Sequence, residues 1–198
     1  MEKFALYLKD QNVKFLRKAQ IRTHFENFCQ LWNSSLTFDS VMASLRKTTV
    51  TYLFDDYWAV SKENPLVLFQ EFLTFLGVSL YYGLTCALYI QGRVWQPPLR
   101  YTLLNTKYTK TRTIKGLTIQ CLKILKELYN AQTLIQTELL VSDYEKTILD
   151  MLYFTEQKFY EPENFEKVNL YLSLFANYPE VRANLIERLG FEKKGLIK

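Results

Sequence analysis

The first third of the chain carries apolar residues at the spacing of amphipathic helices. MEKFALYLKDQNVKFLRKAQ (1–20), IRTHFENFCQLW (21–32) and TFDSVMASLRKT (37–48) each predict a helix, and NSSLT (33–37) predicts a turn that ends in a helix cap. The outward face of the third helix includes Ser40, Ser44, Arg46 and Lys47. Two β-rich runs in TVTYLFDDYWAVS (49–61) then predict a hairpin around Asp55-Asp56.

A second region begins at Asn64-Pro65, a helix cap followed by a residue favoured at the first helical position. The stretch 72–91 is uncharged and long enough to cross a bilayer. Gly77 predicts a helix C-terminus within it, and Ser79 predicts the cap of a new helix. The pattern therefore predicts two short buried helices over 65–90 rather than a membrane span. Downstream, the segments 100–106, 117–124 and 133–141 predict strands, 107–116 predicts a polar connection, and 143–158, 164–177 and 179–190 predict helices.

Together these elements predict an α+β chain that is mostly helical. Residues 1–62 have the order helix, helix, turn, helix, hairpin, which is typical of a winged helix-turn-helix that lays its second motif helix in the DNA major groove. Residues 63–198 predict an α/β domain with a small sheet and a C-terminal helical bundle. The predicted DNA-binding residues are those on the outward face of the third helix: Ser40, Ser44, Arg46 and Lys47.

The tip of the predicted wing is acidic, whereas a DNA-binding wing usually carries cations near the phosphates. Two alternatives stay open. Either the DNA contacts come mainly from the basic segment KFLRKAQIR (14–22), or the first domain does not bind DNA.

Composition excludes several classes of catalytic and metal site. The 198 residues are 48% hydrophobic, enough to bury a core. Cys29, Cys86 and Cys121 lie far apart, so they predict free thiols in a reducing cytoplasm rather than disulfides or a zinc site. His24 is the only histidine and lies in a predicted helix, which argues against a Ser-His-Asp triad. The N-terminus lacks the apolar core of a signal peptide, and no glycine-rich phosphate loop is present, so we expect a cytoplasmic protein without a cofactor or metal.

The stretch VSDYEKTILDMLYF (141–154) gathers three carboxylates around one lysine and could read as an acid/base or metal site. Ser142 and Glu145 have the spacing of a capping box, and Lys146 and Asp150 that of an i,i+4 pair. Asp143 and Glu145 are about 200° apart around a helix, so they cannot share a metal unaided. We interpret the stretch as a capped helix that docks Ile148, Met151 and Leu152.

Two strings resemble the AbiEi family: ENPLVLFQEFLTFLGVSLYYGLTCALYIQG (63–92) and VSDYEKTILDMLYF (141–154), with SDYEKTILD and YYGLTCALYIQG the most specific pieces. The likeness spans residues from about 35 to 190. Members of that family are antitoxins and transcriptional regulators of the AbiE type IV toxin–antitoxin and phage abortive-infection systems. The resemblance implies a winged helix that binds the operon's own promoter DNA. It also implies a second domain that opposes a nucleotidyltransferase-type toxin.

Charge is unevenly distributed along the chain, which bears on the partner. No acidic residue occurs between Glu71 and Glu127, and basic residues gather in the second half of that stretch. With the family resemblance, this segregation predicts a basic surface that faces the toxin or its substrate, with these partner-binding residues: Arg100, Lys107, Lys110, Arg112 and Lys115. The expectation is thus a non-enzymatic antitoxin and regulator. The alternative is a metal-dependent nuclease or nucleotidyltransferase that uses carboxylates.

Overall fold

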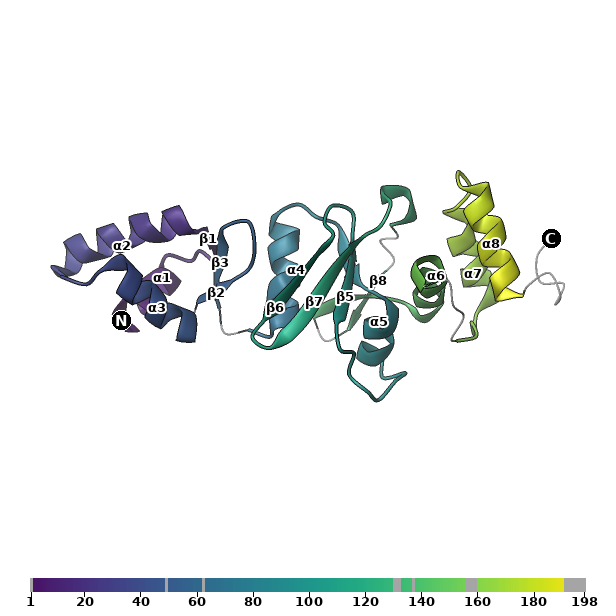
Figure 1. Ribbon diagram of the computed structural model, residues 1–198, viewed down its shortest axis with the longest axis horizontal. Coiled ribbons are helices and arrows are strands. Elements are labelled where there is room, and N and C mark those ends of the chain that lie inside the picture. The colour runs from purple at the N-terminus through teal and green to yellow at the C-terminus, as the bar shows by residue number, and fades with distance from the viewer. Residues whose placement is uncertain are drawn as a thin grey trace. The chain divides into compact units, whose positions relative to one another are not determined.

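Helices and two β-sheets form the described part of the computed structural model, which comprises residues 2–48, 50–61, 63–129, 133–136, 138–155 and 160–190 (Figure 1). The mixed α and β class predicted from the sequence is confirmed. The chain divides into two units, one containing Met1–Phe72 with Arg112–Leu117 and the other containing Leu73–Thr111 with Thr118–Lys198. These units are defined by contacts between residues. The predicted division into two domains, 1–62 and 63–198, stays a prediction.

The first unit opens with three helices and three short strands. In chain order they are α1 (Glu2–Asp10), β1 (Phe15–Arg17), α2 (Lys18–Trp32), α3 (Phe38–Thr48), β2 (Val50–Tyr52) and β3 (Tyr57–Val60). The strands form an antiparallel sheet in the order β1-β3-β2, so the predicted hairpin is confirmed. The single helix predicted over residues 1–20 is wrong, because the chain leaves α1 after Asp10 and pairs Phe15–Arg17 with β3.

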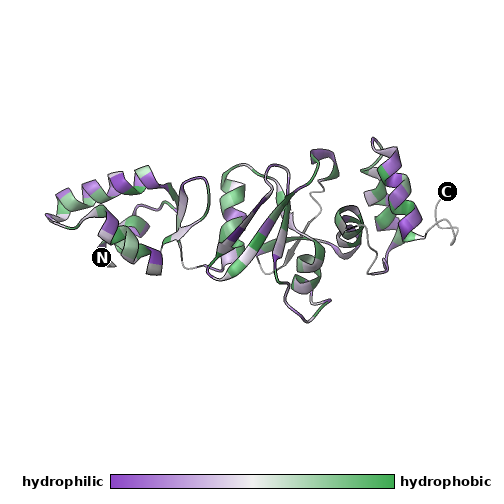
Figure 2. Cartoon of the chain, viewed as in Figure 1, coloured by the Kyte–Doolittle hydropathy of each residue, from purple (hydrophilic) through white to green (hydrophobic). Residues whose placement is uncertain are grey.

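Residues at left-handed φ mark two turns of this unit. Asn33 ends α2 at φ 45°, and Asp55 and Asp56 turn the hairpin at φ 51° and 65°. Asn and Asp tolerate this region better than other non-glycine residues, so Asp-Asp suffices where Asp-Gly would be the stronger signal. The apolar faces of α1, α2 and α3 close a common core with the sheet, around residues such as Phe4, Phe28 and Val41. Figure 2 shows the matching alternation of hydrophilic and hydrophobic residues around α2.

Residues 65–90, where two buried helices are predicted, form a helix, a strand and a helix. The helix α4 (Pro65–Phe75) begins where predicted, with Asn64 Oδ1 accepting from the backbone N–H of Leu66 at 2.9 Å. The second predicted helix is wrong at its start, because Leu80–Tyr82 forms β4 and α5 (Leu84–Ile90) begins only after Gly83. All three β4 residues are buried between neighbouring strands. Among the described helices, none combines the length and apolarity that a bilayer span requires.

The larger sheet has the strand order β6-β7-β5-β4-β9-β8. Its strands are β5 (Tyr101–Asn105), β6 (Lys110–Ile114), β7 (Leu117–Lys123), β8 (Thr133–Gln136) and β9 (Leu139–Ser142), besides β4. β4 pairs antiparallel with β5 and parallel with β9, so it lies inside the sheet. The strands predicted over 100–106 and 117–124 are confirmed, and the run 133–141 divides into the antiparallel pair β8 and β9. The polar connection predicted over 107–116 is wrong, because it contains the edge strand β6.

Three helices follow the sheet: α6 (Tyr144–Thr155), α7 (Phe165–Ser173) and α8 (Pro179–Leu189). A 3-10 turn, η1 (Lys126–Leu128), precedes β8. The three helices predicted for this third are confirmed, apart from residues 156–158, which lie outside the described residues. Asn164 caps α7 by accepting from Lys167 N, and Pro179 and Gly190 bracket α8. Their apolar faces share a core that includes Leu149, Val168, Leu172 and Leu185.

Candidate functional site

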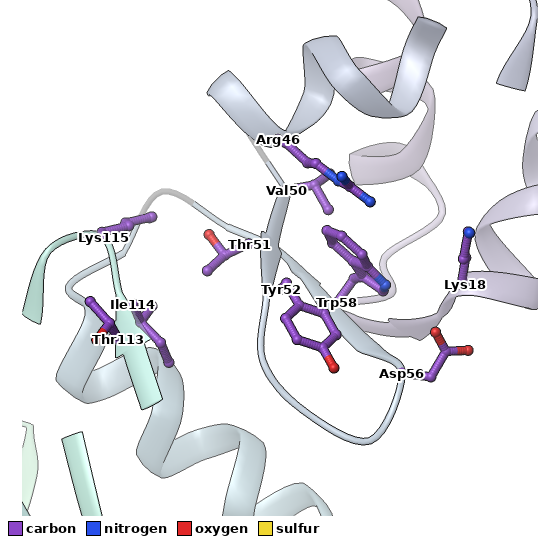
Figure 3. Close-up of a pocket in the computed structure, with 10 residues that line it drawn as sticks. All are labelled: Lys18, Arg46, Val50, Thr51, Tyr52, Asp56, Trp58, Thr113, Ile114 and Lys115. Atoms are coloured by element: carbon purple, nitrogen blue, oxygen red, sulfur yellow. The ribbon is translucent and has the colours of Figure 1, made fainter. Parts of the chain in front are cut away.

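A cavity of about 790 Å³ opens in the first unit. The start of α2, the end of α3, the β2–β3 hairpin and residues 113–115 line it (Figure 3). Its charged wall holds three cations and one carboxylate: Lys18, Arg46, Lys115 and Asp56. Its aromatic wall holds Tyr52 and Trp58. We call it the Trp58 cavity.

The hairpin register brings the two rings together. Tyr52 and Trp58 are directly opposite on β2 and β3, so they project from the same face of the sheet. Their ring centroids are 5.0 Å apart. The Arg46 guanidinium carbon lies 4.9 Å from the centroid of the Trp58 ring, a cation–π contact, and Figure 3 shows it on the opposite side of the indole from Tyr52. The backbone N–H of Lys18 donates to the Asp56 carbonyl at 3.2 Å, which holds the start of α2 against the hairpin turn.

The indole nitrogen of Trp58 is a buried donor without a hydrogen-bond partner among the described residues. Trp58 is only 5% exposed, whereas Tyr52 is 46% exposed. Leaving a buried N–H unpaired costs about 1–3 kcal/mol, so such groups in folded proteins call for an explanation.

The predicted DNA-binding residues lie on α3, although not all of them are free to contact a partner. Ser40 is exposed and its hydroxyl donates to the Thr37 carbonyl at 2.9 Å. Ser44 is half-buried, and Arg46 is exposed over Trp58. The side chain of Lys47 lies outside the described residues. Among the described side chains of this set, Arg46 alone lines the cavity.

The predicted partner-binding residues are divided between the units. Arg112 and Lys115 belong to the first unit, and Arg100, Lys107 and Lys110 to the second. The Lys115 ammonium donates to the carbonyls of Ser61 and Glu63, both at 3.3 Å, and Arg112 has a buried Nε without a partner among the described residues. Lys107 is exposed and Lys110 half-buried, with both ammonium groups near the Tyr108 ring, at 5.2 and 5.5 Å from its centroid. Arg100 is exposed in the loop before β5.

The carboxylates of VSDYEKTILDMLYF are buried, which the sequence pattern did not predict. Asp143, Glu145, Lys146 and Asp150 are at most 6% exposed. Lys146 forms an ion pair with Asp150 and also donates to the Tyr81 hydroxyl at 2.9 Å, and Tyr81 donates to the other Asp150 oxygen at 3.0 Å. Burial is the main cause that raises the pKa values of Asp150 and of Tyr81, although the Lys146 cation opposes the rise at Asp150. This triad of side chains ties α6 to β4.

The predicted capping box is wrong by one residue. Asp143 is the cap, because its Oδ1 accepts from the Lys146 N–H at 2.9 Å, while Ser142 ends β9 and shares a hydrogen bond with the Thr147 hydroxyl. Asp143 also accepts from the Tyr171 hydroxyl at 2.5 Å, and Glu145 accepts from Asn164 N at 3.0 Å. Burial and the Asp143 carboxylate raise the pKa of Tyr171. Each carboxylate thus has a separate structural partner, and no group of three His, Cys, Asp or Glu in the described part of the chain is placed to hold a metal.

A loop of the second unit exposes large apolar side chains. Trp95 is 90% exposed and Leu99 is 97% exposed, on either side of Pro97 and Pro98. Arg93 anchors the loop through a two-pronged ion pair with Glu163, at 2.6 and 3.0 Å, and through its guanidinium carbon 4.4 Å from the centroid of the Tyr144 ring. We call residues 93–100 the Trp95 loop.

Sequence reasoning missed Tyr52, Trp58 and the exposed apolar residues Trp95 and Leu99 as candidate site residues, whereas Lys18 lies in the basic segment 14–22 and Arg100 is a predicted partner-binding residue. One signal was available for the first two, because a hairpin loop centred on Asp55 pairs Tyr52 with Trp58, whereas a two-residue Asp55-Asp56 turn would pair Tyr52 with Ala59. No protein-family model and no curated protein matches this chain.

Proposed function

We propose that the first unit contains a winged helix-turn-helix that binds duplex DNA, in a protein that acts as a non-enzymatic regulator and antitoxin. One observation carries the DNA-binding part: the order α1, β1, α2, α3, β2, β3, with the sheet order β1-β3-β2. In a winged helix, α2 and α3 are the helix-turn-helix, and the β2–β3 hairpin is the wing. Under this proposal α3 would enter the major groove, as the second helix of a helix-turn-helix does.

Exposed basic residues at the start of α2 and the end of α3 support the proposal that these two segments bind the DNA phosphates. Lys18, Arg22 and Arg46 are all exposed. Two of them are oriented by aromatic rings, since the guanidinium of Arg22 lies 5.0 Å from the Phe38 centroid and that of Arg46 lies over Trp58. Exposed cations held in place lose little side-chain entropy when they bind phosphate. The acidic hairpin tip, Asp55-Asp56, points to these residues rather than to the wing as the source of affinity.

The test is binding of the full chain to duplex DNA from upstream of its own gene, measured by fluorescence anisotropy at several salt concentrations. Replacing Arg46 and Lys47 by alanine should weaken binding and reduce the slope of log K against log salt by about 2, one for each lost phosphate contact. Replacing Lys18 and Arg22 should do the same if the start of α2 contributes. The matched control is Lys126→Ala, an exposed lysine of the second unit. No binding by the parent chain would remove the DNA-binding proposal.

The antitoxin part of the proposal has its own supporting observation, which is the Trp95 loop. Trp95 is 90% exposed, and tryptophan is among the residues that dominate protein–protein binding energies. The two prolines and the Arg93–Glu163 ion pair hold the loop in shape, so binding would cost little ordering entropy. The exposed Arg100 at its end would favour an acidic rim on the partner.

A growth assay with a co-expressed nucleotidyltransferase-type toxin tests this part. Trp95→Ala with Leu99→Ala should abolish rescue while the melting temperature is unchanged. Arg100→Glu with Lys107→Glu tests the predicted basic surface without disturbing Lys115 or Arg112, whose side chains have structural contacts or burial. Full rescue by both folded variants would contradict the proposal that these two surfaces oppose the toxin. A Mg²⁺-dependent nuclease or nucleotidyltransferase activity of the purified chain would instead favour the enzymatic alternative.

A further inference from the structure

We infer that the Trp58 cavity is a binding site for a small aromatic anion of the nucleotide class, a planar ring that carries a phosphate. Binding of a small ligand goes beyond the DNA-binding and partner-binding functions proposed above, although the cavity shares Lys18 and Arg46 with the proposed DNA-binding surface. Its volume of about 790 Å³ lies within the range of about 300–1,000 Å³ typical of small-ligand pockets.

The charged wall selects an anion. Lys18, Arg46 and Lys115 line the cavity together with a single carboxylate, Asp56, so its charged residues have an excess of two positive charges. Arginine and lysine together are the usual ligands of phosphate groups in proteins, the first through a planar fork and the second as a point charge. A metal ion would find only one carboxylate here, and a neutral apolar ligand would leave the excess of two positive charges unbalanced.

The aromatic wall selects a planar ring. The half-exposed Tyr52 ring offers a face beside the Trp58 indole, and a guanidinium already stacks on that indole. Nucleobases stack on aromatic and guanidinium planes, at a gain of about 1–3 kcal/mol per base. Figure 3 shows these rings between the cations of α2 and α3 and the segment with Lys115, so a ring and its phosphate fit the same cavity.

The unpaired indole N–H supplies the third requirement, a donor that needs an acceptor. Trp58 is more than nine-tenths buried and lines the cavity, with its nitrogen on the side that faces Lys18 and Asp56 in Figure 3. Lys18 is an exposed, flexible side chain that can move as a ligand enters. A phosphate or base oxygen would then accept the hydrogen bond that no described residue accepts.

The same chemistry occurs in a free nucleotide and at the end of a nucleic-acid strand, so the experiment separates the two. Because Lys18 and Arg46 also belong to the proposed DNA-binding surface, a bound nucleotide would compete with duplex DNA. The competition with duplex DNA rests on the proposed function, whereas nucleotide binding in the cavity does not.

The experiment uses the full chain with Trp32→Phe and Trp95→Phe, which leaves Trp58 as its only tryptophan. Adenosine, guanosine, cytidine and uridine 5′-monophosphates are titrated in turn, followed by the nucleosides, inorganic phosphate and a single-stranded oligonucleotide. At least one monophosphate should quench Trp58 fluorescence saturably, at least tenfold tighter than its nucleoside or phosphate alone. Arg46→Ala and Tyr52→Ala should each weaken that binding at least tenfold, whereas Lys126→Ala should not.

Circular dichroism melting shows whether each variant is folded. If Tyr52→Ala unfolds, Tyr52→Leu retains the bulk and loses the stacking face. Three outcomes would overturn the inference: no saturable binding of any monophosphate, equal binding of phosphate alone, or binding of the oligonucleotide only, which would assign the cavity to nucleic acid. Saturable nucleotide binding without any duplex DNA binding would support the cavity and remove the DNA-binding proposal.

Discussion

The buried ion pair of α6 gives a prediction whose magnitude follows from the structure. The side chains of Lys146 and Asp150 are 3% and 2% exposed. Lys146→Met retains the length and apolar stem of the side chain but leaves the Asp150 carboxylate with the Tyr81 hydroxyl alone. Removing one partner of a buried pair costs about 3–5 kcal/mol. At about 2–4 °C per kcal/mol for a chain of this size, the melting temperature should fall by roughly 6–20 °C.

The assay is urea and thermal unfolding followed by circular dichroism, with Lys126→Met as the matched exposed control. That control should lie within about 0.5 kcal/mol of the parent chain. The triple variant Lys146→Met, Asp150→Leu and Tyr81→Phe removes all three polar groups and should recover most of the loss, since an apolar replacement of a buried pair is often neutral. A loss below about 1 kcal/mol for Lys146→Met would refute the reasoning.

The same variant has a pH signature. Burial raises the pKa of Asp150 in the folded chain, so the folded state holds this proton more tightly than the unfolded state does. The stability from this group is complete below its ordinary pKa of 3.8 and is lost as pH rises through the folded pKa. Lys146 opposes the rise, so Lys146→Met should raise the folded pKa further. The destabilisation should therefore be smaller at pH 4.5 than at pH 7, and an equal or larger loss at pH 4.5 would contradict this account.

Two further variants or reactions test other parts of the fold. Gly83→Ala would place a Cβ 2.8 Å from Leu104 Cδ1, inside the core, and should cost about 1–3 kcal/mol in urea unfolding, whereas Thr85→Ala on the exposed side of α5 should be nearly neutral. Burial raises the pKa values of Cys86 and Cys121 to about 12, so in the folded chain at pH 8 an aromatic disulfide reagent should modify half-buried Cys29 quickly and the other two only on unfolding. Rapid modification of Cys86 in the folded chain would contradict the buried position of α5.

Local sequence determined most of the helices and the hairpin of this protein. Asn64-Pro65, Asn164 and the Pro179–Gly190 bracket act through neighbouring backbone groups, so their meaning does not depend on the rest of the chain. The Asp55-Asp56 turn acts in the same way, because its φ angles are a property of two residues. These residues therefore predict the helix ends and the hairpin turn from the sequence alone.

Tertiary structure decided the strands that the sequence concealed. Leu80–Tyr82 follows a helix-like apolar stretch, and it is a strand because β5 and β9 bind its backbone on both sides. The sequence of Lys110–Ile114 is typical of a polar connection. In the structure it is a strand at the edge of the sheet, where polar side chains are tolerated. Phe15–Arg17 is too short to show a period, and pairing with β3 defines it.

Tertiary structure also decided which charged groups are buried and which residues share a site. The pattern of VSDYEKTILDMLYF is that of an ordinary capped helix, and the hydrogen-bond donors to its buried Asp150 and Asp143, Tyr81 and Tyr171, are distant in sequence. The Trp58 cavity likewise joins Lys18, Arg46, Tyr52 and Lys115 from four segments of the chain. Sequence determines what neighbouring residues do to one another, because those interactions act within a helical turn or a hairpin. Burial and co-location depend on contacts between distant segments, which only the folded chain provides.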